Sequence, residues 1–286
     1  MKKNRRYKLA VLLIGGMVLL SGCSSADPNE SVVKPDDSTT GVYTNLVADK
    51  EKNELKEIMK DVSLSNTDIF FKWAEDYNSS MDKSSGLVQG WSPISESSYK
   101  EDVLSASWDN THVGETDANC RLTAFLLMQN QIKSNPMSDY GTYLMMDVDE
   151  IEKNDRYSTI KENEGNYIAL FNQVSVADAK ADSDYLSAFT EAWSERGVVF
   201  PTGKVSLVSV IMNDSFDKVL FIGHTGILIE EDGYLLFIEK LAPTMPYQVT
   251  RYADRKQMSE TLLARPEYTL GDEDFGTFLM ENDKVL

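Results

Sequence analysis

The chain has 286 residues, of which 42% are hydrophobic, and its formal net charge is −18 at pH 7. This composition suits a globular protein, and because an acidic surface repels phosphate backbones, we expect no nucleic-acid partner. The chain holds only two cysteines and two histidines. A zinc cluster would need several carboxylates in addition, so we expect neither a metal site nor a cofactor.

The first 22 residues have the pattern of a signal peptide. Residues 2–8 carry five basic side chains, and residues 9–20 are apolar apart from two glycines, which is too short a segment to span a bilayer permanently. The run Leu-Ser-Gly-Cys that ends at Cys23 resembles the recognition box of bacterial lipoproteins. That resemblance implies that Cys23 carries a lipid and begins the mature chain. Removal of the five basic residues takes the formal net charge from −18 to −23.

We therefore expect the lipid on Cys23 to hold the protein at the extracytoplasmic face of the cell membrane. The alternative is an uncleaved N-terminal anchor with an incidental cysteine, which needs a longer apolar segment. Residues 23–41 contain almost nothing to bury, and they predict a flexible tether. The remaining residues, 42–286, are long enough for a single domain with a substantial core.

Helical patterns dominate the first half of that domain. The spacing of apolar residues predicts a helix over 49–61 and a second helix that begins at Ser65 or Asn66. Residues 79–116 are rich in Ser, Gly and Asp and predict a long irregular connection that carries His112. Connections of this length are commonly functional.

A third helix is predicted over 119–133, with Asp117 or Asn119 as its cap and Cys120 in its first turn. If Cys23 is lipidated, Cys120 has no partner for a disulfide. An unpaired thiol outside the cell is exposed to oxidation, so Cys120 is either buried as a small hydrophobic residue or kept for its chemistry.

Helical character returns over 150–172 and 183–196. The dense acids of residues 147–155 lack the spacing and the glycine of an EF-hand, and they predict a solvated acidic face. After Pro201 short apolar runs alternate with turn residues and predict an antiparallel meander, so the fold class is α+β, with N-terminal helices followed by an antiparallel sheet. The predicted strands are 205–212, 218–222, 225–229, 234–240 and 247–252, and a helix over 254–263 closes the fold.

Cys120 and His224 are the candidate catalytic pair. A thiol attacks carbonyl carbon as its thiolate, and the first turn of a helix favours that anion through unpaired amides and the positive end of its dipole. His224 lies near the start of a predicted strand, in the run Gly-His-Thr-Gly. From there its imidazole could take the thiol proton and later deliver it to a leaving amine. The amide of Cys120, next to Asn119, would contribute to an oxyanion hole.

Glu239 is the candidate residue that orients the imidazole. A two-residue turn at Asp232–Gly233 or at Glu231–Asp232 would place His224 and Glu239 on one face of a hairpin. In the first register the two residues are diagonal neighbours, and in the second they are direct partners. A three-residue turn would put Glu239 on the opposite face.

The order of helix-borne Cys120, strand-borne His224 followed by Gly226, and then Glu239 resembles that of papain-like cysteine peptidases, most closely the NlpC/P60-type cell-wall amidases. The resemblance implies a papain-like arrangement of helix and sheet and the cleavage of amide bonds in cell-wall peptides. The chain departs from the pattern in three ways. No glutamine lies shortly before Cys120, Arg121 follows it, and 104 residues separate the cysteine from the histidine.

Over nearly the whole mature length, the chain is also similar to a family of Gram-positive bacterial lipoproteins that is catalogued as a domain of unknown function. This similarity implies the lipid anchor and the domain limits, and it supplies no activity. The residues that carry it are Tyr43, Thr44, Asn45, Leu46, Asn119, Cys120, Arg121, Gly223, His224, Thr225 and Gly226.

Two functions remain open at this point. One is a membrane-anchored thiol hydrolase or acyltransferase that acts on amide bonds such as those of peptidoglycan peptides, with Cys120 as nucleophile, His224 as base and Glu239 as orienting residue. The other is a non-catalytic ligand-binding or adhesion lipoprotein on a papain-like scaffold, which uses the connection 79–116 and its aromatic residues. In that case His224 ends a turn and Glu239 pairs with Lys240.

Overall fold

The computed structural model describes residues 41–268 and 276–286. The expected signal peptide, the lipid-attachment residue Cys23 and all of the expected tether except Gly41 lie outside the described residues. The described residues all belong to one compact unit, which lies within residues 34–286. Within the described part, no helix has both the length and the apolar character needed to cross a membrane.

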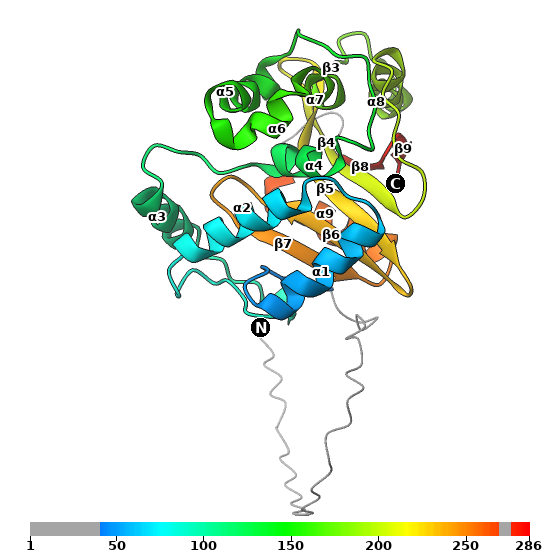
Figure 1. Ribbon diagram of the computed structural model, residues 1–286. Helices are drawn as coiled ribbons and strands as arrows, with labels where there is room; N and C mark the ends of the chain where they lie inside the picture. Colours follow the sequence, from blue (N-terminus) through cyan, green and yellow to red (C-terminus); the bar gives the residue numbers. More distant parts are fainter. Residues whose placement is uncertain (1–40, 269–275) are drawn as a thin grey trace, which may run out of the picture. The chain divides into compact units, whose positions relative to one another are not determined.

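Among the described residues, a nine-stranded antiparallel sheet forms the centre of this unit (Figure 1). Its strand order is β2-β1-β7-β6-β5-β4-β8-β9, and β3 pairs with β5 outside this path. The strands are β1 (Val42–Thr44), β2 (Ser92–Pro93), β3 (Val174–Ser175), β4 (Val205–Asp214), β5 (Val219–Glu231), β6 (Tyr234–Lys240), β7 (Tyr247–Tyr252), β8 (Phe278–Glu281) and β9 (Lys284–Val285).

Most of the helices precede the long strands in the chain, which confirms the predicted α+β class. The α-helices are α1 (Asp49–Asp61), α2 (Thr67–Ser80), α3 (Glu101–Thr111), α4 (Cys120–Met128), α5 (Met145–Lys153), α6 (Ser158–Lys161), α7 (Glu164–Phe171), α8 (Asp182–Glu195) and α9 (Arg255–Leu263). The short 3₁₀ helices are η1 (Ile94–Glu96), η2 (Thr142–Leu144), η3 (Asp155–Tyr157) and η4 (Pro266–Tyr268).

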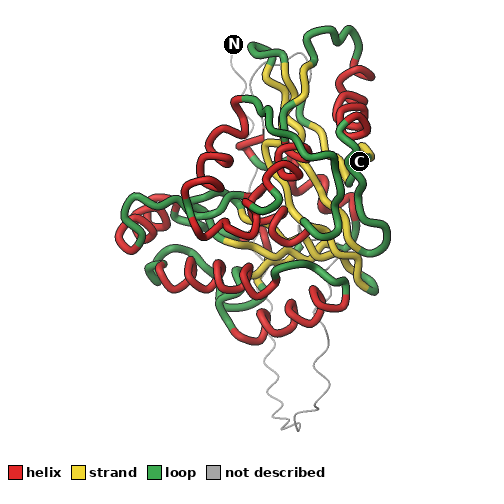
Figure 2. Tube along the Cα trace, turned by 45° about the horizontal axis from the view of Figure 1, so that its top comes forward, coloured by secondary structure: helices red, strands yellow, loops and turns green. Residues whose placement is uncertain are grey.

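Helices cover both faces of the sheet (Figure 2). Because side chains alternate along a strand, β6 sends Leu236 and Ile238 into the larger core with α1, α2 and α4, and Leu235 and Phe237 into a smaller core under α9. Every residue of α4 except Arg121 is buried, so this helix lies inside the domain. Figure 1 shows it between the sheet and the group α5 to α8.

The predicted segments 79–116 and 119–133 differ from the structure. Residues 79–116 are not one irregular connection, because α3 spans Glu101–Thr111 within them and buries Leu104 and Trp108 one turn apart. The serine-rich composition of this stretch concealed that spacing. The predicted helix 119–133 stops at Met128, where Gln129 is the C-cap.

The two predicted strands 218–222 and 225–229 are one long strand, β5. The pairing of β5 with β4 shifts by one residue at Gly223, because Val210 pairs with His224 while the neighbouring Ile211 pairs with Ile222. A bulge therefore marks the position where the sequence pattern is interrupted, and it turns the strand just before His224.

Candidate active site

Cys120 is the first residue of α4, and its thiol is the one free cysteine among the described residues. The helix begins there because Asn119 is its N-cap: the Asn119 Oδ1 accepts a hydrogen bond of 2.9 Å from the amide of Leu122. Cys120 is 7% exposed. The thiol thus lies in the first turn of a capped helix, as predicted, and it is close to fully buried.

A buried carboxylate holds this helix start in place. Asp147 on α5 accepts hydrogen bonds from Asn119 Nδ2 (2.6 Å) and Arg121 Nε (2.6 Å) on α4, and from the hydroxyl of Tyr167 (2.5 Å) on α7. The expectation of a solvated acidic face over 147–155 is therefore wrong for Asp147, which is 3% exposed. Both ends of the Asn119 side chain are occupied by these bonds, so the amide that would serve as an oxyanion donor is that of Cys120.

The start of α4 lies against an unpaired stretch of β5. On the edge of β5 that faces β6, the pairing with β6 ends at Gly226, and β3 pairs with residues 219–220. Between these two stretches, the carbonyl of Ile222 accepts a hydrogen bond of 2.9 Å from Arg121 Nη1, and the amide of Thr225 lies close enough to the Cys120 side chain to lower the pKa of its thiol. The edge of the sheet therefore brings the thiol beside His224.

His224 is oriented by Glu239. The β5–β6 hairpin turns at Asp232–Gly233, with Gly233 at a φ of 89°, and it pairs Gly226 with Glu239. His224 and Glu239 are therefore diagonal neighbours, which is the first of the two registers considered from the sequence. The His224 Nε2 and the Glu239 Oε2 lie 2.7 Å apart, and both side chains are buried. This bond occupies Nε2 and leaves Nδ1 as the ring nitrogen for the thiol.

Glu239 is itself held by two residues that the sequence analysis did not single out. Arg265 donates from Nη1 and Nη2 to the two carboxylate oxygens of Glu239, each at 2.7 Å, and Gln248 Nε2 donates to Oε1 at 3.2 Å. A fork of this kind fixes the plane of the carboxylate. Burial raises the pKa of Glu239, but the charge and hydrogen bonds of Arg265, followed by those of His224, lower it to about 2. Glu239 is therefore an anion at neutral pH.

Charge is arranged to favour a thiolate and an imidazolium. Burial raises the pKa of Cys120, but the hydrogen bond and charge of His224, the charge of Arg121 and the amide of Thr225 outweigh it, so the thiol pKa lies below its usual value. Burial lowers the pKa of His224, but the thiol of Cys120 and the carboxylate of Glu239 raise it to about 9. Each group stabilises the charged form of its neighbour.

The ring of Tyr268 lies over the imidazole. Its centroid is 5.6 Å from that of His224, with an interplanar angle of 28°, and Tyr268 is buried. The stacked ring of Tyr268 and the guanidinium of Arg265 both come from the short segment 264–268, which directly follows α9. The segment thus covers the His224–Glu239 pair on the side of the sheet opposite α4.

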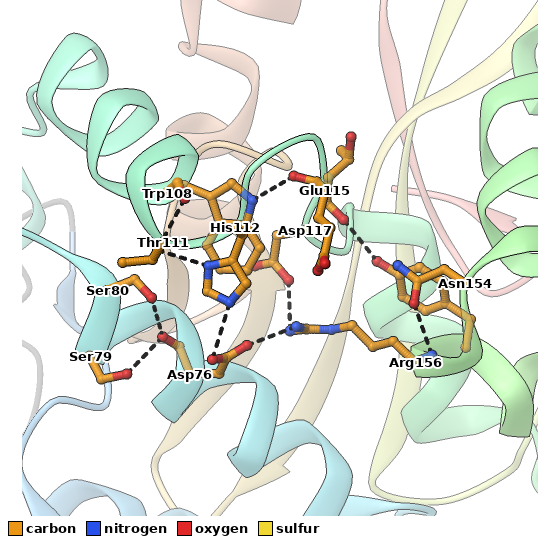
Figure 3. A network of polar contacts seen from close by, with 12 residues as sticks. Asp76, Ser79, Ser80, Trp108, Thr111, His112, Glu115, Asp117, Asn154 and Arg156 are labelled. Atoms are coloured by element: carbon orange, nitrogen blue, oxygen red, sulfur yellow. Dashed lines mark hydrogen bonds and ion pairs between the residues drawn. The ribbon is translucent and has the colours of Figure 1, made fainter.

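A second network, partly buried, lies on the α4 side of the sheet, next to the loop that leads into Cys120 (Figure 3). Asp117 in that loop forms ion pairs with Lys240 Nζ (2.8 Å) and Arg156 Nη2 (2.8 Å). Arg156 also contacts Asp76, and Asp76 lies 3.4 Å from the Nε2 of His112. His112 thus belongs to this second network. Lys240 pairs with Asp117 and not with its neighbour Glu239, which faces the other side of the sheet.

Among the described residues, no group of three or more His, Cys, Asp and Glu side chains is arranged to hold a metal ion. The sequence-derived candidates Cys120, His224 and Glu239 do come together, in one buried line from a helix start through an imidazole to a carboxylate. Such a line, carried by an α+β domain, is the arrangement expected of a thiol-dependent enzyme.

The chain belongs to a family described as Domain of unknown function (DUF4300), whose profile matches residues 42–286. The expected membership in a family catalogued as a domain of unknown function is therefore confirmed. Neither a curated protein nor a solved structure matches the chain.

Proposed function

We propose that this protein is a thiol hydrolase or acyltransferase that acts on amide bonds, with Cys120 as nucleophile, His224 as general base and acid, and Glu239 as the residue that orients the imidazole. The observation that carries the proposal is the buried line from Cys120 through His224 to Glu239, in which a helix start and an anchored carboxylate stabilise a thiolate–imidazolium pair. The same geometry supports the resemblance to papain-like cysteine peptidases.

The chemistry follows from these positions. The Cys120 thiolate attacks the carbonyl carbon of the amide, and the oxyanion that forms accepts a hydrogen bond from the amide of Cys120 at the helix start. The imidazolium of His224 gives its proton to the leaving amine, which leaves a thioester on Cys120. Neutral His224 then takes a proton from water or from an acceptor amine, whose attack releases the acyl group and restores the thiolate.

The place of action in this proposal is the outer face of the cell membrane. Its support is the pattern of the first 22 residues and the run that ends at Cys23. A lipid on Cys23 would keep the domain close to the cell wall, and peptidoglycan peptides supply amide bonds there. Labelling of the protein by a fatty-acid probe in cells, and loss of the label in Cys23→Ser, tests the anchor independently of the chemistry.

The reactivity of Cys120 tests the proposed chemistry. In the full chain that carries Cys23→Ser, Cys120 is the one remaining thiol, and its alkylation by iodoacetamide can be followed from pH 5 to pH 10. We expect alkylation well below the pH at which a free cysteine reacts, and loss of this low-pH reactivity in His224→Ala. A thiol that reacts with the profile of free cysteine, or independently of His224, would exclude the proposal.

The rival function is a ligand-binding or adhesion lipoprotein on the same scaffold, and one observation favours it. Cys120 is 7% exposed and His224 is 1% exposed, so a substrate carbonyl reaches the thiol only if side chains move. If Cys120 proves inert to iodoacetamide in the folded protein and reactive after unfolding, the cysteine is structural and the binding function takes precedence.

A further inference from the structure

A groove lies on the α9 side of the sheet. Its volume is about 1170 Å³, and its walls come from α9, from residues 94–101 and from the loop 241–245 between β6 and β7. Ligand sites of small molecules usually enclose about 300–1000 Å³. This groove is therefore large enough for several residues of an extended peptide.

The floor of the groove is connected to the candidate active site. Gln248 and Arg265 line it, and these are the two residues that hold the Glu239 carboxylate. Tyr99 also lines it and donates a hydrogen bond of 2.8 Å to Gln248 Oε1. A chain of hydrogen bonds thus runs from the groove through Glu239 to His224. A ligand in the groove would rest on the same side chains that orient the imidazole.

The charges around the groove are mostly negative. Four carboxylates line it, those of Glu101, Asp254, Glu260 and Glu267, whereas its cations are Lys256 and Arg265. The charge of Arg265 is already matched by Glu239. The lining also includes the large apolar side chains Ile94, Leu241 and Met245. The lining therefore matches an extended chain that carries both apolar and cationic side chains.

We propose that this groove binds an extended cationic peptide segment. Cys120 and His224 do not line the groove, so it suits the part of a substrate that lies away from the reacting bond. Contacts to such remote parts of a substrate can supply the binding energy that positions the reacting bond. That use of the groove rests on the proposed hydrolase function, whereas peptide binding does not.

Isothermal titration calorimetry with two capped hexapeptides tests the binding. The peptides are Ac-(Ala-Lys)₃-NH₂ and Ac-(Ala-Glu)₃-NH₂, and we expect saturable binding of the lysine peptide alone. Glu101→Gln/Glu267→Gln should weaken this binding about fivefold, because each exposed charge contact contributes modestly. A matched control is Glu152→Gln/Glu162→Gln, which changes the net charge equally at exposed positions outside the groove. The control should change the affinity less than twofold.

The results separate the groove from the acidity of the whole protein. Absence of saturable binding, or an equal loss in the groove variant and in its matched control, overturns the proposal. Thr261→Trp provides a second check, since a large side chain from α9 would fill the groove, and it should abolish binding without unfolding the protein. If far-ultraviolet circular dichroism shows that Thr261→Trp is unfolded, the groove variant Glu101→Gln/Glu267→Gln and its matched control alone decide whether the groove binds the lysine peptide.

A reactive peptide distinguishes failure of this inference from failure of the proposed function. Ac-Ala-Lys-Ala chloromethyl ketone and its glutamate counterpart alkylate a thiolate with loss of chloride. We expect the lysine reagent to react about five times faster with Cys120, and this preference to vanish in Glu101→Gln/Glu267→Gln while iodoacetamide reactivity stays unchanged. Equal rates for both reagents on a reactive Cys120 exclude the substrate role. If Cys120 is inert but calorimetry shows selective binding of the lysine peptide, the groove is a peptide-binding site and the hydrolase function is excluded.

Discussion

The Nε2 of His224 and the Oε2 of Glu239 lie 2.7 Å apart although the two residues are not direct partners across β5 and β6. Gly226 is the direct partner of Glu239, and the ring of Phe237 packs against it. A Cβ on Gly226 would lie 2.4 Å from the ring of Phe237. The absence of a side chain on Gly226 thus allows Phe237 to pack between the two strands beside the His224–Glu239 contact.

The charge of Glu239, and not its shape, should control the reactivity of Cys120. In Glu239→Gln the imidazolium of His224 loses the anion beside Nε2, so its pKa should fall from about 9 and the thiol pKa should rise. We expect the onset of iodoacetamide alkylation to move to higher pH by about one unit or more, as for loss of an opposite charge in contact. Onset at the wild-type pH would mean that Glu239 does not act on the pair.

Stability in acid should depend on the same carboxylate. The pKa of Glu239 in the folded protein, about 2, lies below its ordinary value of 4.5. Its contribution to the free energy of unfolding is therefore complete above pH 4.5 and is lost as the pH falls from there toward 2. Urea unfolding of the wild type and of Glu239→Gln from pH 6 to pH 3 measures this contribution to the free energy of unfolding. The difference between the two proteins should narrow as the pH falls, and a constant difference contradicts the assignment.

Sequence patterns were sufficient where a local period decides the structure. The helix α1, the strand β6 and the strand β7 have the predicted bounds. The helix buries Leu55 and Met59 one turn apart, and the two strands are short runs buried on both faces and bounded by turns. For His224 and Glu239 the sequence allows two two-residue turns and one three-residue turn, and the structure has the two-residue turn at Asp232–Gly233.

Contacts between distant segments could not be predicted in this way. No local pattern shows that the start of α4 packs against the open edge of β5, or that Arg265 reaches back to Glu239 from beyond α9. Asp147 belongs to a run of acids that looks solvated, and only the packing of α5 against Arg121 and Tyr167 buries it. These residues complete the site through tertiary structure.

Arg121 should tune the thiol by its charge. Its charge lowers the pKa of Cys120, and its guanidinium is held by Asp147. Arg121→Met should raise the thiol pKa by about one unit, and it should also destabilise the protein by about 3–5 kcal/mol because Asp147 loses its ion-pair partner. Alkylation profiles and urea unfolding measure the two effects.

Arg121→Lys separates charge from geometry at this position. An ammonium restores the positive charge but lacks the planar fork that reaches both Asp147 and the carbonyl of Ile222. The thiol pKa should therefore return close to the wild-type value while part of the stability loss persists. If Arg121→Lys has the same thiol pKa as Arg121→Met, the positive charge of Arg121 is not what lowers the pKa of Cys120.

The buried ion pair of Asp117 and Lys240 should hold the loop that leads into Cys120 against β6. Burial lowers the pKa of Lys240 to about 8, against the opposing pull of Asp117. In Asp117→Asn the ammonium loses that anion, so its pKa should fall further, and the variant should lose about 3–5 kcal/mol at neutral pH. Because the wild-type lysine loses its proton as the pH rises through about 8, the difference in stability between the wild type and Asp117→Asn should narrow toward pH 9.

Asp117→Asn should also raise the thiol pKa of Cys120, since the loop that leads into Cys120 loses its anchor. Glu54→Gln is the matched control, because it breaks the ion pair with buried Arg251 of β7 in the same sheet. It should lower stability without moving the thiol pKa. An unchanged alkylation profile in Asp117→Asn, measured at urea concentrations where the protein remains folded, would show that the pair stabilises the fold and does not position Cys120.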